Sequence, residues 1–446
     1  MSVINIILIL FIGFFQSIYG KYGFGGEQEW GFVTVRPGAN MFYWLYYTTA
    51  NVTSYTEKPL LIWLEGGPGI PSTGYTNFQE IGPLTLNLTT RDNSLVKDYN
   101  ILFIDSPVGT GFSNVNTENK LARTEQQVIN DLIILIEQFF MKFSILSKVQ
   151  TYIVGTCYGG RTAAALAYEW IQKIEKGWNI TNLKGVGLSS AWISPVDSAL
   201  GWAPYLYQNG IVDDKGYKAI MNLTKQIKYK IKTKDWRDVY DLFINTINEI
   251  PKYVGNVNLY NIFSRVNNHH FYAYYAEDNN AMKILMESKV KSALNLPENS
   301  YYEPDLETIN KRLAVKIMKP ITKKVEYLLN QNNFKVFVFN GQFDLIVNSQ
   351  GTFKWVKNLS WNNSAEWLAA RREPLIINDF IEGYVKSYGN LRMYWVNRAG
   401  HATFVDNPVA VREILHRLTD DDNNDDLFNY ANLERFINSL QSQKKN

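Results

Sequence analysis

The chain has one cysteine, Cys157, in 446 residues. A lone cysteine cannot form an intramolecular disulfide, so the sequence excludes a fold held together by cross-links. Stability must come from a packed core. The hydrophobic content of 46% provides for such a core, in one large domain with an insertion or in two domains.

The chain also lacks a large excess of charge of one sign and has few long apolar runs. The 45 basic residues nearly balance the 42 acidic ones, and the net charge of +3 does not indicate a nucleic-acid partner. After residues 3–15, no apolar run is long enough to span a bilayer. The sequence therefore predicts a globular protein without a membrane span.

The first twenty residues carry no charged side chain and contain the apolar run 3–15, which is typical of a signal peptide. We therefore expect a secretory-pathway protein that begins after residue 20. Six Asn-x-Ser/Thr sequences fit that route as glycosylation sites: Asn51, Asn87, Asn179, Asn222, Asn358 and Asn362.

One stretch carries a catalytic signature. Residues 149–154, rich in β-branched and aromatic side chains, predict a buried strand, and the alanine-rich residues 161–170 predict a helix. Between them, Gly155, Cys157 and Gly159 have the spacing of a nucleophile elbow, in which small residues allow a sharp turn. The nucleophile is usually Ser and is here Cys157. A small buried hydrophobe would also explain this cysteine.

Further strands alternate with helices and predict an α/β sheet with right-handed crossovers. A hairpin is expected over residues 30–47, and a helix is expected after Thr124, which has capping-box spacing to Gln127. The other expected strands are 60–64, 101–104, 183–188, 335–339 and 391–396.

The pattern divides the chain after the signal peptide into four parts. Residues 21–196 and 319–419 form the two halves of the core, and residues 197–318 form an inserted helical cap. Residues 420–446 form an acidic and then helical extension. The lysine run of residues 225–234 is most simply a solvated helix face.

Two candidate catalytic residues each follow a late strand. Asp344 comes after residues 335–339, and His401 comes after residues 391–396. The order Cys157, Asp344, His401 is that of an α/β-hydrolase triad. His269 and His270 fall in the expected cap and His416 in a terminal helix, so His401 is the preferred base.

In this arrangement His401 would take the proton of Cys157, and Asp344 would fix the imidazole tautomer. The backbone N–H groups of Gly67 and Tyr158 would hold the oxyanion. Gly67 lies in the loop Glu65-Gly66-Gly67-Pro68-Gly69, which an ordinary turn would also explain.

Together these segments resemble the serine carboxypeptidase family, and residues 33–36 and 192–198 most resemble its retinoid-inducible branch. The motifs occur in order over nearly the whole mature chain: residues 63–69, 105–113, 155–160, 340–344 and 399–401. The resemblance implies an α/β hydrolase fold with a mixed, mostly parallel sheet. It also implies a secreted or lysosomal exopeptidase that removes C-terminal residues at acidic pH, without a metal or organic cofactor.

The departures from the family concern the site. Cys157 stands where the family has Ser, and Ile70 stands where its loop has Cys. At the family positions that hold the substrate carboxylate next to Gly66, this chain has Glu65, Gln79 and Thr156 in place of Asn, Glu and Glu.

Three hypotheses remain at this point. The chain is a hydrolase of peptide or ester substrates with Cys157 as nucleophile and altered or reduced activity, a secreted homologue that acts by binding, or an esterase or acyltransferase. The oligomeric state does not follow from the sequence.

Overall fold

The computed structural model describes residues 21–23, 26–178, 182–255, 257–264, 279–304 and 306–420. The expected signal peptide, Asn179, His269, His270 and the extension from residue 421 onward lie outside these residues.

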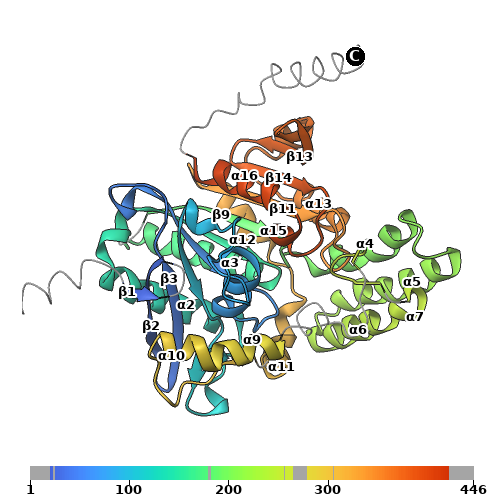
Figure 1. The fold of residues 1–446 in the computed structure, drawn as a ribbon. Coiled ribbons are helices and arrows are strands. Elements are labelled where there is room, and N and C mark those ends of the chain that lie inside the picture. The colour runs from blue at the N-terminus through green and yellow to red at the C-terminus, as the bar shows by residue number, and fades with distance from the viewer. Residues whose placement is uncertain are drawn as a thin grey trace, which may run out of the picture.

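A twelve-stranded mixed sheet organises the described residues, in the order β1-β2-β3-β5-β4-β8-β9-β11-β14-β13-β12, with β7 beside β3 (Figure 1). Neighbouring strands are parallel from β5 to β14 and antiparallel toward both margins. The parallel strands are β4 (Leu60–Leu64), β5 (Asn100–Ile104), β8 (Gln150–Thr156), β9 (Asn182–Ser189), β11 (Lys335–Gly341) and β14 (Leu391–Val396).

The predicted hairpin forms β2 (Gly26–Arg36) and β3 (Ala39–Tyr46), which pair antiparallel. The remaining strands are β1 (Lys21–Gly23), β6 (Thr110–Gly111), β7 (Asn114–Val115), β10 (Glu303–Pro304), β12 (Arg372–Ile377) and β13 (Phe380–Tyr388). The sequence did not predict β12 and β13. Their burial alternates irregularly because they lie at the margin of the sheet and expose part of each face.

Both faces of the sheet are covered, as the all-apolar parallel strands require. On one face, Ile62, Ile153 and Val338 pack with helices α2 (Glu125–Lys142), α3 (Tyr158–Glu175) and α12 (Thr322–Leu329). On the other face, Leu61 and Val154 pack with α16 (Pro408–Thr419). The predicted cap of α2 is present, since Thr124 Oγ1 accepts a hydrogen bond from Gln127 N at 3.1 Å.

The helical insertion has two parts that lie in different places. The first part is an arm of four helices that extends away from the sheet (Figure 1): α4 (Pro195–Gln208), α5 (Asp214–Ile231), α6 (Trp236–Glu249) and α7 (Pro251–Val254). The second part runs back along the sheet through α9 (Asn279–Leu285), the π-helical turn η6 (Met286–Val290) and α10 (Lys291–Ala293), where Met286 and Val290 join the core of the α16 face. It is followed by α11 (Leu306–Ile317).

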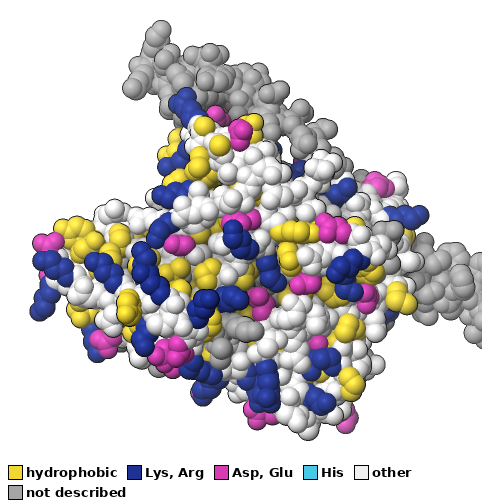
Figure 2. Space-filling model, turned by 180° about the vertical axis from the view of Figure 1, so that it is seen from behind, with side chains coloured by type: hydrophobic (Ala, Val, Ile, Leu, Met, Phe, Trp, Pro, Cys, Tyr) yellow, Lys and Arg dark blue, Asp and Glu magenta, His cyan; other side chains and the backbone are white. Residues whose placement is uncertain are grey.

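The surface of the arm confirms the prediction for the lysine run, because Lys225, Lys228 and Lys232 are exposed. Lys and Arg side chains are spread across the face of the molecule shown in Figure 2.

Among the described residues, no helix is both long and apolar enough to cross a membrane. Short helices complete the core: α13 (Ser349–Lys357), α14 (Ser364–Ala369) and α15 (Thr403–Asp406).

Candidate active site

Cys157 lies at the sharp turn between β8 and α3. Its φ of 57° is in the left-handed region, which a non-glycine residue adopts only under constraint. The flanking glycines allow the turn: a Cβ on Gly155 would lie 2.3 Å from Gly159 O, and one on Gly159 would lie 2.2 Å from Leu64 O. The turn is tied to β9, since Cys157 N donates to Ser189 O at 3.0 Å. The predicted elbow is therefore present in the backbone.

His401 and Asp344 lie at the carboxyl ends of the neighbouring strands β14 and β11. His401 Nδ1 and Asp344 Oδ2 are 2.7 Å apart, and both side chains are buried. Asp344 Oδ1 accepts a hydrogen bond from Val347 N, which fixes the carboxylate. Tyr260 supports the histidine in two ways: its carbonyl accepts from His401 N at 2.8 Å, and its ring stands edge-on at 5.0 Å from the imidazole.

The electrostatics of this pair favour the imidazolium. Burial disfavours the charged ring, but the charges of Asp344 and Cys157 outweigh it and hold the pKa of His401 well above 6.5. The second ring nitrogen, Nε2, is buried and makes no hydrogen bond to any atom of the described residues. The imidazole is thus oriented on one side by Asp344 and interacts with Cys157 through its charge.

The glycine loop after β4 packs directly against the elbow. A Cβ on Gly66 would lie 2.8 Å from Cys157 Cβ and 3.4 Å from Tyr158 N, so this approach requires glycine. Gly67 has a φ of 104° and lines the same pocket as Cys157 and Tyr158. The two predicted oxyanion donors therefore belong to segments that meet at Cys157.

Two buried glutamates lie on the core side of the site, and we call Glu65 and Glu80 the acidic wall. Glu65 Oε2 accepts from Thr76 Oγ1 at 2.7 Å, and its Oε1 accepts from Gly66 N at 3.0 Å. Burial raises the pKa of Glu65. Burial and the charge of Glu65 raise the pKa of Glu80 well above 4.5, while the charge of His401 lowers both.

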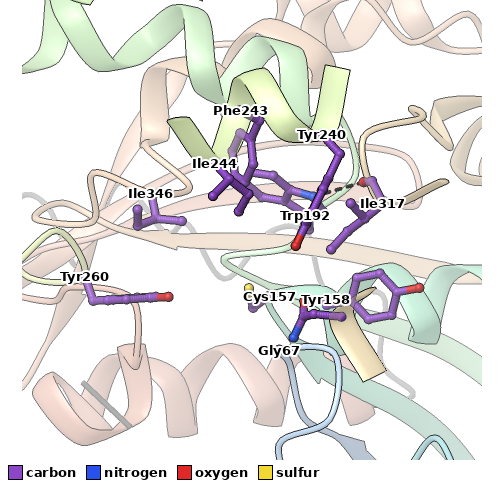
Figure 3. Close-up of a pocket in the computed structure, with 11 residues that line it drawn as sticks. Gly67, Cys157, Tyr158, Trp192, Tyr240, Phe243, Ile244, Tyr260, Ile317 and Ile346 are labelled. Atoms are coloured by element: carbon purple, nitrogen blue, oxygen red, sulfur yellow. Dashed lines mark hydrogen bonds between the residues drawn. The ribbon is translucent and has the colours of Figure 1, made fainter. Parts of the chain in front are cut away.

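Glu65 and Glu80 lie behind the pocket, whose lining is mostly hydrophobic, and we call its main group of hydrophobic side chains the apolar wall. It comprises Trp192, Tyr240, Phe243, Ile244, Ile317 and Ile346. Three of these come from α6 of the arm. Figure 3 shows the Cys157 sulfur facing the side chains of this wall, with Tyr240 pointing from α6 toward it. Trp192 is fixed by a hydrogen bond from its Nε1 to Ile317 O at 3.1 Å and by an edge-on contact with Phe243.

The remaining predicted site residues lie at different depths. Thr156 is buried beneath the loop, and its carbonyl oxygen would be 3.2 Å from a Cβ on Gly66. Gln79 is half-buried, whereas its neighbour Glu80 is buried and interacts with Glu65. Sequence reasoning missed Glu80. The signal was available, since Glu80 directly precedes Ile81-Gly82-Pro83. Sequence reasoning also missed the apolar wall.

Within the described part of the chain, no group of three or more His, Cys, Asp or Glu side chains could hold a metal ion.

The serine carboxypeptidase family profile matches residues 20–421. The chain belongs to the serine carboxypeptidase family. The retinoid-inducible serine carboxypeptidase of Homo sapiens is 34% identical over 399 residues, which cover 84% of this chain and 88% of that protein. Serine carboxypeptidase-like 51 of Arabidopsis thaliana is 31% identical, with 90% and 93% covered.

The fold agrees with this membership. A prohormone-processing carboxypeptidase from Saccharomyces cerevisiae superimposes with a TM-score of 0.77 at 22% identity, covering 89% of this chain and 92% of that structure. The protein is thus a serine carboxypeptidase family hydrolase with the α/β hydrolase fold. The predicted family and fold are confirmed.

Proposed function

We propose that this protein is a carboxypeptidase that removes C-terminal residues through a Cys157-His401-Asp344 mechanism. One observation carries the proposal: an imidazole held by a buried carboxylate at 2.7 Å is electrostatically coupled to the residue at the nucleophile elbow. A binding protein would not need that pair, because a buried, charged His–Asp pair is costly to maintain without further function.

The acylation step begins with the thiol proton on His401 Nε2, in keeping with the raised pKa of His401, and Cys157 Sγ attacks the scissile carbonyl carbon. The N–H groups of Gly67 and Tyr158 donate to the oxyanion of the tetrahedral adduct. The imidazolium then protonates the leaving amine, the C–N bond breaks, and a thioester remains on Cys157. The raised pKa of His401 supports this acid role.

In the deacylation step, His401 accepts a proton from water, whose oxygen attacks the thioester carbonyl. The C–S bond breaks, the acid product leaves, and the proton taken from water stays on His401 beside the released Cys157 sulfur. Acylation is the harder step with this nucleophile, since a thiolate leaves the adduct more readily than an unprotonated amine. Sulfur is also larger than oxygen, and a displacement of about 1 Å from the oxyanion donors costs on the order of a hundredfold.

The acidic wall supports recognition of a free C-terminus. A raised pKa keeps a carboxyl group protonated at acidic pH, and a protonated carboxyl donates a hydrogen bond to a substrate carboxylate. Ionised glutamates would instead repel that carboxylate. We therefore assign Glu65 and Glu80, with Gly66 and the neighbouring Gln79 and Thr156, to the carboxylate side of the site.

The apolar wall supports a preference for substrates with a hydrophobic side chain next to the scissile bond. Its lining offers no charged group to pair with a charged substrate residue.

A secreted or lysosomal location fits the apolar residues 3–15 and the proposed activity at acidic pH. Five of the six candidate glycosylation sites, Asn51, Asn87, Asn222, Asn358 and Asn362, are exposed.

The test compares three substrates with the same apolar residues: a peptide with a free C-terminus, its C-terminal amide, and a depsipeptide whose scissile bond is an ester. We expect turnover of the free-acid peptide at pH 5, less of its amide, and the fastest turnover of the depsipeptide. The Asp344→Asn protein gives the background rate. If the unmodified protein turns over neither the free-acid peptide nor the depsipeptide faster than this variant, the proposal fails and the binding hypothesis replaces it. Turnover of the ester alone would favour an esterase.

A further inference from the structure

A second cavity opens at the opposite edge of the sheet, where the parallel strands begin. Its volume is about 590 Å³, within the range of small-molecule sites. The side chains from the strands include Lys184 of β9, Lys335 of β11 and Arg392 of β14. Loops from three other parts of the chain supply amide side chains. The lining contains three cationic residues and no Asp or Glu.

The cationic groups are held in the wall of the cavity. The Arg392 guanidinium lies over the Phe337 ring, 5.1 Å from its centroid. Lys335 Nζ is directed to the end of α16, where it donates to Arg417 O. Lys184 is half-buried and has no ion pair with any described residue. The lining therefore presents cationic side chains with no acidic side chain among them.

Hydrogen bonds hold together the loops that supply the amide side chains. Asn390 Nδ2 donates to Leu329 O at 3.0 Å and to Phe334 O at 2.9 Å, and Asn362 N donates to Asn330 Oδ1 at 2.9 Å. These bonds fix the positions of the loops. The side chains of Asn332, Asn333 and Asn363 also line the cavity, and none of them hydrogen-bonds within the described residues.

We propose that this cavity binds an anionic saccharide, with a sulfate or phosphate group between Lys184 and Arg392 and ring hydroxyls on the amides of Asn332, Asn333 and Asn363. Guanidinium and ammonium groups bind such oxyanions. Amides both donate and accept, as a hydroxyl does, so an amide-rich wall suits a ligand with many hydroxyls. A bare inorganic anion would use the cations and leave these amides unpaired.

The chain's own glycosylation could fill the same place, because Asn362 lines the cavity and belongs to the sequence Asn362-Asn363-Ser364. All test proteins therefore carry Ser364→Ala, which removes the acceptor sequence and leaves the lining side chains unchanged. This keeps an attached sugar from being mistaken for a bound one.

The experiment measures calorimetric binding of a sulfated disaccharide, a neutral disaccharide and sodium sulfate at 0.15 M ionic strength. We expect saturable one-to-one binding of the sulfated disaccharide, at least tenfold tighter than either of the others. The double variant Lys184→Gln/Arg392→Gln should weaken it at least tenfold. The matched control Lys218→Gln/Lys225→Gln removes the same charge from exposed positions on α5 and should change it less than twofold.

Three results would overturn the proposal: equal binding of the neutral disaccharide, equal binding of sulfate, or equal weakening by the two double variants. Arg392 packs on the core, so thermal melting checks each variant. If the double variant does not fold, Asn332→Asp serves instead. This exposed residue has no side-chain partner to lose, and its added negative charge should weaken the sulfated ligand at least fivefold. Unchanged binding there would also reject the site.

Discussion

The two walls beside Cys157 have different origins. The acidic wall comes from the end of β4 and from the π-helical segment η2 (Ser72–Ile81), both of which belong to the core of the fold. The apolar wall comes largely from α6 and α11 of the insertion. In the proposed function, recognition of a substrate carboxylate is thus tied to the sheet, whereas side-chain preference lies on helices that can change without disturbing it. The following predictions test that separation.

The largest effect should come from the His401–Asp344 pair, which belongs to neither wall and on which the cleavage of every substrate depends. Asp344→Asn should reduce turnover of peptide and depsipeptide alike by on the order of a thousandfold, because the imidazole loses its orienting carboxylate. Steady-state kinetics with both substrates measure it. A loss confined to one substrate would show that His401 acts with a different partner.

Cys157→Ser should raise peptide hydrolysis by at least about tenfold, roughly 1.4 kcal/mol of barrier, since oxygen restores the shorter bond and the poorer leaving group. The depsipeptide should gain less, because its alkoxide leaves without prior protonation more easily than an amine does. Single-turnover rates separate the two. A serine variant that folds but turns over neither substrate would show that the cysteine is not the main cause of reduced activity.

Glu80→Gln should flatten the pH dependence of free-acid peptide binding. Burial and the charge of Glu65 raise the pKa of Glu80 well above 4.5, so its carboxyl stays protonated to a higher pH than an ordinary glutamate, and KM should increase on the order of tenfold as the pH rises through its ionisation. Gln cannot ionise, and its KM should change less than about threefold over that range. The exposed Glu366→Gln serves as control and should follow the unmodified protein.

The smallest effect should be a change of side-chain preference in the apolar wall. Ile244→Lys places a charge on α6 and should lower kcat/KM for an apolar substrate about fivefold while raising it for one with an acidic residue. Asn245→Lys, exposed on the same helix, adds the same charge outside the pocket and should leave the preference unchanged. An altered pH profile in the Ile244 variant would mean that the walls are not independent.

The sequence predicted what depends on local spacing. The strands at 60–64 and 391–396 were predicted to the residue, because a short apolar run bounded by turn residues identifies a buried strand. The elbow followed from its glycines, and His401 and Asp344 followed from their places after strands. These three roles stay predictions of mechanism, and the geometry described above supports them.

What the sequence did not predict depends on contacts between distant segments. The apolar wall joins Trp192 to α6 and α11, and no periodicity links them. Glu80 was passed over for Gln79, since only the turn of η2 decides which of two adjacent side chains faces Glu65. The sequence likewise did not predict that the insertion divides into an arm and a second part, because both parts share the same helical pattern.

The single cysteine allows the reactive sites in a preparation to be counted. Cys157 is half-buried at the pocket floor, and no other thiol competes for a reagent. One added label per molecule, weighed by intact-mass spectrometry, would give the fraction of a preparation whose Cys157 thiol is reduced and accessible. Reducing agents, which unfold many secreted proteins, would leave this one intact, so Cys157 can be kept reduced until the reductant is removed and the label is added.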